Sequence, residues 1–162
     1  MKPVAVVAGS SSDLSRVQPA LDCLDDFGVP YEFRIFSAHR TPGALEAWVA
    51  SLEGRGFGAV IAAAGWSAHL AGAVAARTVL PVIALPLSGG FLQGAEALLS
   101  MVQMPPGVPV ATVGVDGAKN AALLAVEILA VEDVQLRERL WRFREEQRQA
   151  VLKADAELGR KL

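Results

Sequence analysis

Five short apolar runs, regularly spaced along the chain, constrain its fold more than any other feature of the sequence. Stretches with the periodicity of helices separate them, and they lie at residues 3–8, 31–36, 59–63, 81–85 and 109–113. A continuous apolar run of this kind is typical of a strand buried on both faces, as in a parallel sheet covered by helices. The sequence therefore predicts an α/β fold with five such strands, and with helices that begin near Asp13, Pro42, His69, Gly94 and Lys119.

Local signals mark two of these helix starts. Ser12 can cap the helix that follows it, and Thr41 stands before Pro42, a residue type favoured at the first helical position. These signals locate the loops that follow the first two strands. In an open parallel sheet, ligands bind at the carboxyl ends of the strands, where the strand order reverses. We therefore expect the functional residues in the loops after strands one, two and three.

The end of the chain differs in composition from the rest. Among residues 133–162, 14 are charged, and apolar residues recur at spacings of three, four or their multiples: Leu136, Leu140, Phe143, Val151, Ala154 and Leu158. This pattern predicts a long amphipathic helix. We therefore divide the chain into a sheet domain, 1–132, and a C-terminal helix, 133–162. The helix can pack on its own domain, but its apolar residues include Trp141, and we favour contacts with another subunit.

Composition excludes several classes of protein. Lys and Arg number 15 against 17 Asp and Glu, a net charge of -2 that does not favour nucleic acid or an anionic membrane. Cys23 is the only cysteine, which rules out an intrachain disulfide and any multi-cysteine metal site and fits a reducing compartment. No apolar run approaches the roughly 18 residues of a membrane span, and the N-terminus does not read as a signal peptide. We expect a soluble, cytoplasmic protein.

The loop after the first strand, residues 9–13 (GSSSD), is a candidate anion site. Backbone N–H groups, three hydroxyls and the positive end of a helix meet there. The loop lacks the lysine of a P-loop and the spaced glycines of a dinucleotide site, so neither a nucleoside triphosphate nor NAD is indicated. A turn that only caps its helix is the alternative. Asp13 would repel a phosphate but can bind sugar hydroxyls, so a phosphorylated sugar accounts for both features.

The loop after the second strand combines His39 with Arg40, just before a helix. An arginine can bind a phosphate in a fixed geometry while a histidine transfers a proton. The alternative is an ordinary polar surface loop. The position of this loop at the carboxyl end of a strand favours the functional interpretation.

The loop after the third strand holds His69, the only other histidine. Residues 65–69 begin like a Gly-x-Ser-x-Gly nucleophile elbow, but His69 occupies the last glycine position, which disfavours a hydrolase that would use Ser67. Two histidines without cysteines or an acidic cluster do not indicate zinc either. We expect chemistry without a metal. The alternative for His69 is a residue at a helix start that bonds only to backbone.

Taken together, five segments resemble the bacterial N5-carboxyaminoimidazole ribonucleotide mutase family of purine biosynthesis. They are GSSSD, SAHRTP, AGWSAHLAG, LLSMVQMPPGVPVATV and GAKNAALLA, and the resemblance runs from about residue 4 to 131. It implies a three-layer flavodoxin-like fold and a homo-octamer in which the C-terminal helix contacts other subunits. It also implies a reaction without metal, ATP or biotin, and hence no cofactor. In that reaction a carboxylate moves from the exocyclic nitrogen of an aminoimidazole ribotide to carbon C4 of the ring.

The resemblance also implies roles for individual residues. His39 would be the general acid and base that assists the loss of CO2 and its recapture at C4. Other positions would bind the ribonucleotide: Ser10 and Arg40 its phosphate, Asp13 its ribose, Ser37 and Ala38 the pocket wall, and Gly65, His69 and Leu70 the region of the imidazole and CO2.

The third loop departs from the family pattern. Trp66 and Ser67 replace small residues, and Ala71 replaces a proline. The indole can narrow the pocket or point into an interface. A related branch of the family carboxylates aminoimidazole ribotide directly with CO2, and this is one alternative function, although GAKNAALLA is closer to the mutase branch. The other alternative is a nucleotide-binding flavodoxin-like module without catalysis.

Overall fold

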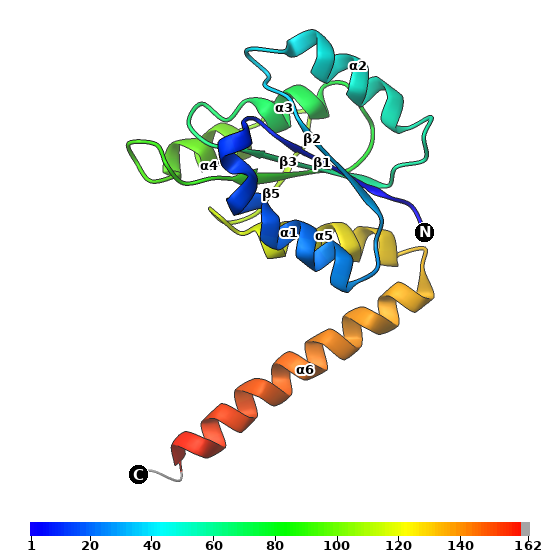
Figure 1. Cartoon of the computed structure of the whole chain (residues 1–162), viewed down its shortest axis with the longest axis vertical. Helices are drawn as coiled ribbons and strands as arrows, with labels where there is room; N and C mark the ends of the chain where they lie inside the picture. Colours follow the sequence, from blue (N-terminus) through cyan, green and yellow to red (C-terminus); the bar gives the residue numbers. More distant parts are fainter. Residues whose placement is uncertain (160–162) are drawn as a thin grey trace.

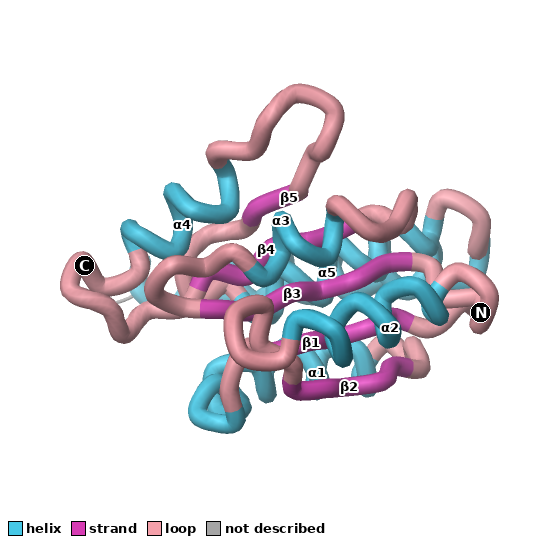
Figure 2. Tube along the Cα trace, turned by 90° about the horizontal axis from the view of Figure 1, so that it is seen from above, coloured by secondary structure: helices cyan, strands magenta, loops and turns pink. Residues whose placement is uncertain are grey.

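A five-stranded parallel sheet forms the centre of the chain in a computed structural model that describes residues 1–159 (Figure 1). The strands are β1 Val4–Ala8, β2 Tyr31–Ile35, β3 Ala59–Ala64, β4 Val82–Pro86 and β5 Ala111–Thr112. Their order is β2-β1-β3-β4-β5, and Figure 2 shows them side by side in this order, with β2 at one edge and β5 at the other. This is the strand order of flavodoxin-like folds, so the predicted fold class is confirmed.

Helices cover both faces of the sheet. They are α1 Leu14–Asp26, α2 Pro42–Leu52, α3 Leu70–Ala75, α4 Ala95–Val102, α5 Ala118–Ala130 and α6 Val134–Gly159, with a 3-10 turn η1 Ser11–Asp13 before α1. The helices α1 and α5 contribute to one buried cluster, and α2, α3 and α4 to the other (Figure 1). The result is three layers, helices on sheet on helices.

The central strands are buried on both faces, as predicted. Along β1, Val4 and Val6 belong to the cluster under α1 and α5, whereas Ala5 and Val7 belong to the cluster under α2, α3 and α4. Side chains of a strand alternate between its two faces, so both faces of β1 need apolar residues. The same holds for β3 and β4, whose residues are all buried.

The prediction that all five strands are buried on both faces is wrong for the two edge strands. In β2, Arg34 and Ile35 are exposed and the remaining residues are half-buried. The strand β5 contains only Ala111 and Thr112, neither of them buried, in place of the five residues expected. In β2 the charged residues Glu32 and Arg34 alternate with apolar ones, and both edge strands have a neighbouring strand on one side only, so burial falls at the two edges.

Of the two predicted helix caps, the residue differs at the first and the hydrogen bond differs at the second. Ser12 lies inside η1, and the cap is Ser10, whose Oγ accepts the Ser12 backbone N–H at 3.3 Å. Thr41 occupies the position before α2, but its hydroxyl makes no capping hydrogen bond to that helix. Instead Thr41 Oγ1 accepts the backbone N–H of Ser37 at 2.9 Å, which satisfies a backbone group at the end of β2.

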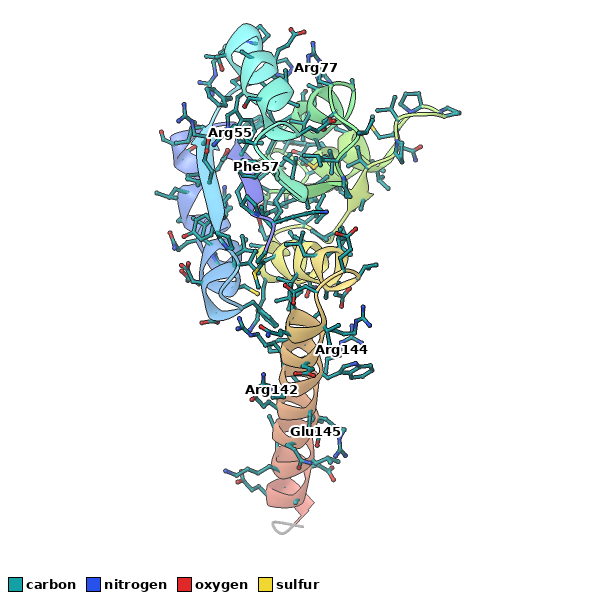
Figure 3. The ribbon with its side chains drawn as sticks, turned by 90° about the vertical axis from the view of Figure 1, so that its right-hand side faces the viewer. Arg55, Phe57, Arg77, Arg142, Arg144 and Glu145 are labelled. Carbon is teal, nitrogen blue, oxygen red and sulfur yellow. The ribbon has the colours of Figure 1, made fainter. Side chains whose placement is uncertain are left out.

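The helix α6 packs on its own domain only near its beginning. Leu136 and Leu140 are buried in the α1–α5 cluster, and the ring of Phe143 meets that of Phe27 edge to face, with centroids 5.5 Å apart. Farther along, Val151 and Leu158 are exposed. Figure 1 and Figure 3 show the helix projecting from the domain, and Figure 3 labels Arg142, Arg144 and Glu145 on its projecting part. Residues 160–162 of the predicted helix lie outside the described residues.

Two smaller observations concern the core and the membrane. Cys23 and Trp48 are buried in the core. Across residues 1–159, the structure contains no helix with the length and apolar character needed to span a bilayer.

Candidate active site

Three loops at the carboxyl ends of β1, β2 and β3 form one cavity of about 430 Å³. The strand β1 lies between β2 and β3, so this is the place where the strand order reverses. All nine residues singled out from the sequence line this cavity: Ser10, Asp13, Ser37, Ala38, His39, Arg40, Gly65, His69 and Leu70. The structure therefore brings together every position that the resemblance selected, from segments up to 60 residues apart in the chain.

Five further residues line the cavity and received no individual role from the sequence: Gly9, Ser12, Ala64, Trp66 and Ser67. Gly9 and Ser12 belong to the loop predicted as an anion site, and Trp66 and Ser67 to the loop of His69. Ala64, at the end of β3, carries no functional group by which the sequence could have indicated it.

The two histidines form a hydrogen-bonded pair across the cavity. Nε2 of His39 and Nδ1 of His69 are 2.9 Å apart, and the ring planes meet at 76°. The side chain of His69 makes no capping bond at the start of α3, so the alternative of a helix-start residue bonded only to backbone is wrong. The ring of His69 instead orients the ring of His39.

This pair can exist in two protonation patterns. When His39 is an imidazolium, its Nε2–H donates to His69 Nδ1, which must then be an acceptor. Because this bond occupies Nε2, the nitrogen of His39 that is free to exchange a proton with a ligand is Nδ1. When Nδ1 loses its proton, Nε2–H still donates to His69 Nδ1, so the hydrogen bond persists while His39 loses and regains a proton. A group that must give up a proton and then take one back needs this property.

The loop between β2 and α2 is held by its own side chains. Ser37 Oγ accepts the backbone N–H groups of His39 at 3.3 Å and of Arg40 at 3.1 Å. The hydroxyl of Thr41 also donates to the carbonyl of Ser37 at 3.2 Å. These bonds close a tight turn, and they fix the directions in which the histidine and the arginine leave the backbone.

Arg40 joins the first two loops. Its Nη2 donates to the carbonyl oxygen of Gly9 at 3.0 Å, which places a guanidinium beside the serine-rich turn after β1. There the hydroxyl of Ser12 donates to Ser10 Oγ at 2.9 Å, and this leaves the hydroxyl hydrogen of Ser10 available for a ligand. A guanidinium and a free hydroxyl donor together suit an anion such as a phosphate.

Asp13 lies in the cavity beside these donors. Burial raises the pKa of its carboxyl group, and the backbone amide of Ser10 and the charges of Arg16 and Arg40 oppose that rise. A carboxylate that is partly withdrawn from water gains from hydroxyl donors, because they replace lost solvent. The environment of Asp13 therefore favours a polyhydroxyl ligand over an anion at that point of the cavity.

The third loop carries the departures noted in the sequence. Trp66 lines the cavity with φ +56°, in the left-handed region, and its side chain is 67% exposed. Gly65 lies so close to the β4–α4 loop that an added Cβ would come within 3.2 Å of the carbonyl oxygen of Leu87. Ser67 is exposed on the cavity wall. Within residues 1–159, no group of three or more His, Cys, Asp or Glu side chains is placed to hold a metal ion.

Comparison with known proteins decides the family. The sequence model described as AIR carboxylase matches residues 3–150. The chain belongs to the AIR carboxylase family. An N5-carboxyaminoimidazole ribonucleotide mutase of Pyrococcus abyssi is 50% identical over 146 residues, which are 90% of this chain and 84% of that protein. The mutase of Pseudomonas aeruginosa is 48% identical over 151 residues, 92% of this chain and 93% of that protein.

A solved structure agrees with this membership. The crystal structure of Treponema denticola PurE superposes with a TM-score of 0.90 at 30% sequence identity, covering 98% of this chain and 99% of that chain. In this member of the AIR carboxylase family, the three loop motifs meet at the cavity.

Proposed function

We propose that this chain is an N5-carboxyaminoimidazole ribonucleotide mutase of purine biosynthesis in which His39 carries the proton. The observation that carries this proposal is the His39–His69 pair, held in a cavity that also contains a guanidinium, a free serine hydroxyl and a half-buried carboxylate. A proton carrier, an anion site and a polyol site in one cavity match a reaction on the base of a phosphorylated sugar.

The substrate would lie across the three loops. Arg40 and Ser10 bind the 5'-phosphate, and Asp13 accepts hydrogen bonds from the ribose hydroxyls. Ser37 and Ala38 form the wall next to His39. Gly65, His69 and Leu70 surround the imidazole ring and the released CO2. Leu70 is buried, so this end of the cavity is the more apolar one.

The reaction balances with His39 as the only proton carrier. The imidazolium of His39 gives its proton to the exocyclic nitrogen as the N–C bond of the carbamate breaks, and CO2 leaves with an amine remaining. Carbon C4 then attacks CO2 and forms the new C–C bond. Neutral His39 removes the proton from C4, which restores the aromatic ring and the starting imidazolium. The proton passes through Nδ1 of His39, and His69 supports both states because its Nδ1 accepts from His39 Nε2–H in each of them.

Replacing His39 by asparagine tests this role. We expect His39→Asn to lower kcat by about 10²–10⁴-fold, because the amide cannot transfer a proton, while ribonucleotide affinity changes little. Turnover is measured as interconversion of the two carboxylated ribotides without added metal or ATP, and affinity by titration calorimetry. Undiminished turnover in this variant would show that another group carries the proton. A wild-type chain that binds the ribotides without turnover would support the non-catalytic module.

Direct carboxylation by dissolved CO2 is the alternative reaction, and in reverse it would make the enzyme a lyase. Internal transfer requires that CO2 stays in the cavity between the two steps. Substrate labelled with ¹³C in its carboxylate should therefore yield labelled product even in unlabelled bicarbonate buffer. Loss of the label during a single turnover would favour the carboxylase.

We further propose that the chain works in the cytoplasm as a homo-octamer. In this arrangement residues 1–132 form the catalytic domain, and residues 133–162 form a helix that contacts other subunits. The exposed apolar side chains beyond the packed beginning of α6 support this division.

A further inference from the structure

Trp66 is the only tryptophan among the residues that line the cavity. Trp48 is 7% exposed and its Nε1–H donates to Glu32 Oε1 at 2.8 Å, so it is a core residue. Trp141 is as exposed as Trp66, but it lies on α6, away from the cavity, with the guanidinium of Arg144 5.9 Å from its ring centroid. Trp66 is therefore the exposed tryptophan that a ligand in the cavity can reach.

The backbone at Trp66 is in a conformation that favours glycine. Its φ of +56° lies in the left-handed region, where a Cβ atom is crowded by the backbone, and a bulky residue there is a genuine outlier. Strained residues of this kind cluster at active sites and ligand-binding segments. Glycine would satisfy the turn at no steric cost, so the fold alone does not account for an indole at this position.

The place of Trp66 in the cavity indicates what the indole contacts. It belongs to the same loop as His69, whose ring bonds that of His39. The proposed function assigns the sugar phosphate to Ser10 and Arg40, which come from the other two loops. A ligand held there would extend its base toward the histidines and therefore toward the third loop.

We propose that Trp66 stacks on the aminoimidazole ring of the substrate and covers the reacting end of the cavity. This inference rests on the proposed function, since the ring is the part of the substrate that reacts at His39. A flat indole offers the apolar face on which a heteroaromatic ring stacks, and it keeps water from the place where CO2 is released. The stacking preference explains why a strained tryptophan occupies a glycine-type turn.

Three variants separate stacking from general damage to the pocket. Trp66→Ala should raise the Kd of 4-carboxyaminoimidazole ribonucleotide about 10-fold, whereas Trp66→Phe, which keeps an aromatic face, should stay within about threefold of wild type. The matched control Trp141→Phe should leave affinity unchanged. Because the side chain of Trp66 is largely exposed, its truncation leaves no cavity in the core, and an unchanged melting temperature verifies folding.

Two further readouts are specific to ring contact. Ribose 5-phosphate has the sugar phosphate but no ring, so its Kd should be the same for wild type and Trp66→Ala. Binding of the ribonucleotide should change the tryptophan fluorescence of the wild type and of Trp141→Phe, but not that of Trp66→Phe. An equal loss of affinity for ribose 5-phosphate in Trp66→Ala, or a fluorescence change that survives in Trp66→Phe, would overturn the proposal.

Failure of this inference is distinguishable from failure of the proposed function. A wild-type chain that does not interconvert the two carboxylated ribotides contradicts the mutase. A wild-type chain that does so, together with a Trp66→Ala variant of unchanged KM and unchanged Kd, contradicts only the stacking role.

Discussion

Among single residues, Asp13 shows most clearly how the cavity changes the chemistry of a side chain. Its carboxyl group is half-buried beside the first loop, and burial raises its pKa above the ordinary value of 3.8. The folded chain therefore binds this proton more tightly than the unfolded chain does. As pH rises through the interval between 3.8 and the raised pKa, the unfolded state loses the proton first, so stability is lost across that interval. Above it, the ionised carboxylate costs folding free energy that a ligand can offset.

Replacing Asp13 by asparagine should remove this pH dependence. At pH values above the raised pKa of Asp13, we expect Asp13→Asn to be more stable than wild type. Below pH 3.8, where the carboxyl group is protonated in both states, we expect no such advantage. The same variant should bind the ribonucleotide more weakly, because an amide accepts fewer hydrogen bonds from the ribose than a carboxylate. Thermal unfolding of both proteins across the acid range measures the first effect, and calorimetric titration the second.

Glu132 supplies a control of opposite sign for that experiment. It is exposed, and its hydrogen bond with Lys2 lowers its pKa below 4.5. Its contribution to stability is therefore present above 4.5 and lost as pH falls through the lowered pKa. Glu132→Gln should thus be less stable than wild type above that range, whereas Asp13→Asn should be more stable. If both substitutions changed stability in the same direction at that pH, the raised pKa of Asp13 would be contradicted.

At the level of elements, the edge strand β2 is joined to α2 by polar contacts as well as by packing. Trp48 on α2 donates to Glu32 on β2, and Arg55, just beyond α2, pairs with the same carboxylate. Those two hydrogen bonds lower the pKa of Glu32, with that of Arg55 the larger cause. The guanidinium of Arg55 also lies 4.9 Å from the ring centroid of Phe57, and Figure 3 labels both residues near this edge. The loop that carries His39 follows β2, so this anchor helps to position the site.

Trp48→Phe should test how much the hydrogen bond contributes to that anchor. Phenylalanine keeps an apolar ring next to Phe36, but Glu32 loses its hydrogen-bond donor. We expect the loss of this bond to lower the free energy of unfolding by about 1 kcal/mol, in addition to any effect of the smaller ring on packing. In a Glu32→Ala background that bond is already absent, and the same substitution should cost less. Urea unfolding of the four proteins in this cycle measures the difference. Equal costs in both backgrounds would show that the bond is energetically neutral.

For the whole molecule, the site and the projecting helix lie at different ends of the domain. The cavity is at the carboxyl ends of β1, β2 and β3, whereas α6 leaves the domain near the N-terminus, where Lys2 pairs with Glu132 at 2.8 Å (Figure 1). The beginning of α6 completes the α1–α5 cluster, and the projecting part exposes Val151, Leu152 and Leu158. Helix contacts between subunits would therefore not obstruct the cavity of the same chain.

A chain that ends after Gln147 should fold but fail to assemble. It keeps Leu136, Leu140 and Phe143, which pack on the domain, and loses the exposed apolar residues farther along the helix. We expect the melting temperature of the domain to change little and the sedimentation coefficient to fall. A full-length variant with serine at Val151, Leu152 and Leu158 tests the same surface without shortening the helix. An unchanged particle size in both variants would mean that α6 does not hold the assembly together.

Predictions from the sequence were most reliable where a single physical cause, such as the burial of an apolar run, determines the local structure. The apolar runs at β1, β3 and β4 predicted buried strands, and the motifs around Ser10, His39 and His69 predicted three loops near one another. Such predictions were less reliable at β2 and β5, because charged residues alternate with apolar ones in β2 and because edge strands are less covered than central ones. They also misplaced the first cap, which is Ser10 instead of Ser12, and they located Thr41 at the cap position of α2 without predicting that its hydroxyl bonds Ser37 instead of the helix.

The alternation of strands and helices, the loops with functional residues, the family resemblance and the residue types available for chemistry could all be read from the amino-acid sequence. These follow from local periodicity and from motifs, which are properties of neighbouring residues. The folded chain was needed to find that His39 and His69, 30 residues apart, share a hydrogen bond, that Arg40 reaches Gly9, and that the backbone of Trp66 is left-handed. Such contacts depend on how parallel strands are ordered in the sheet, and the separation of two residues along a chain contains no direct record of that order.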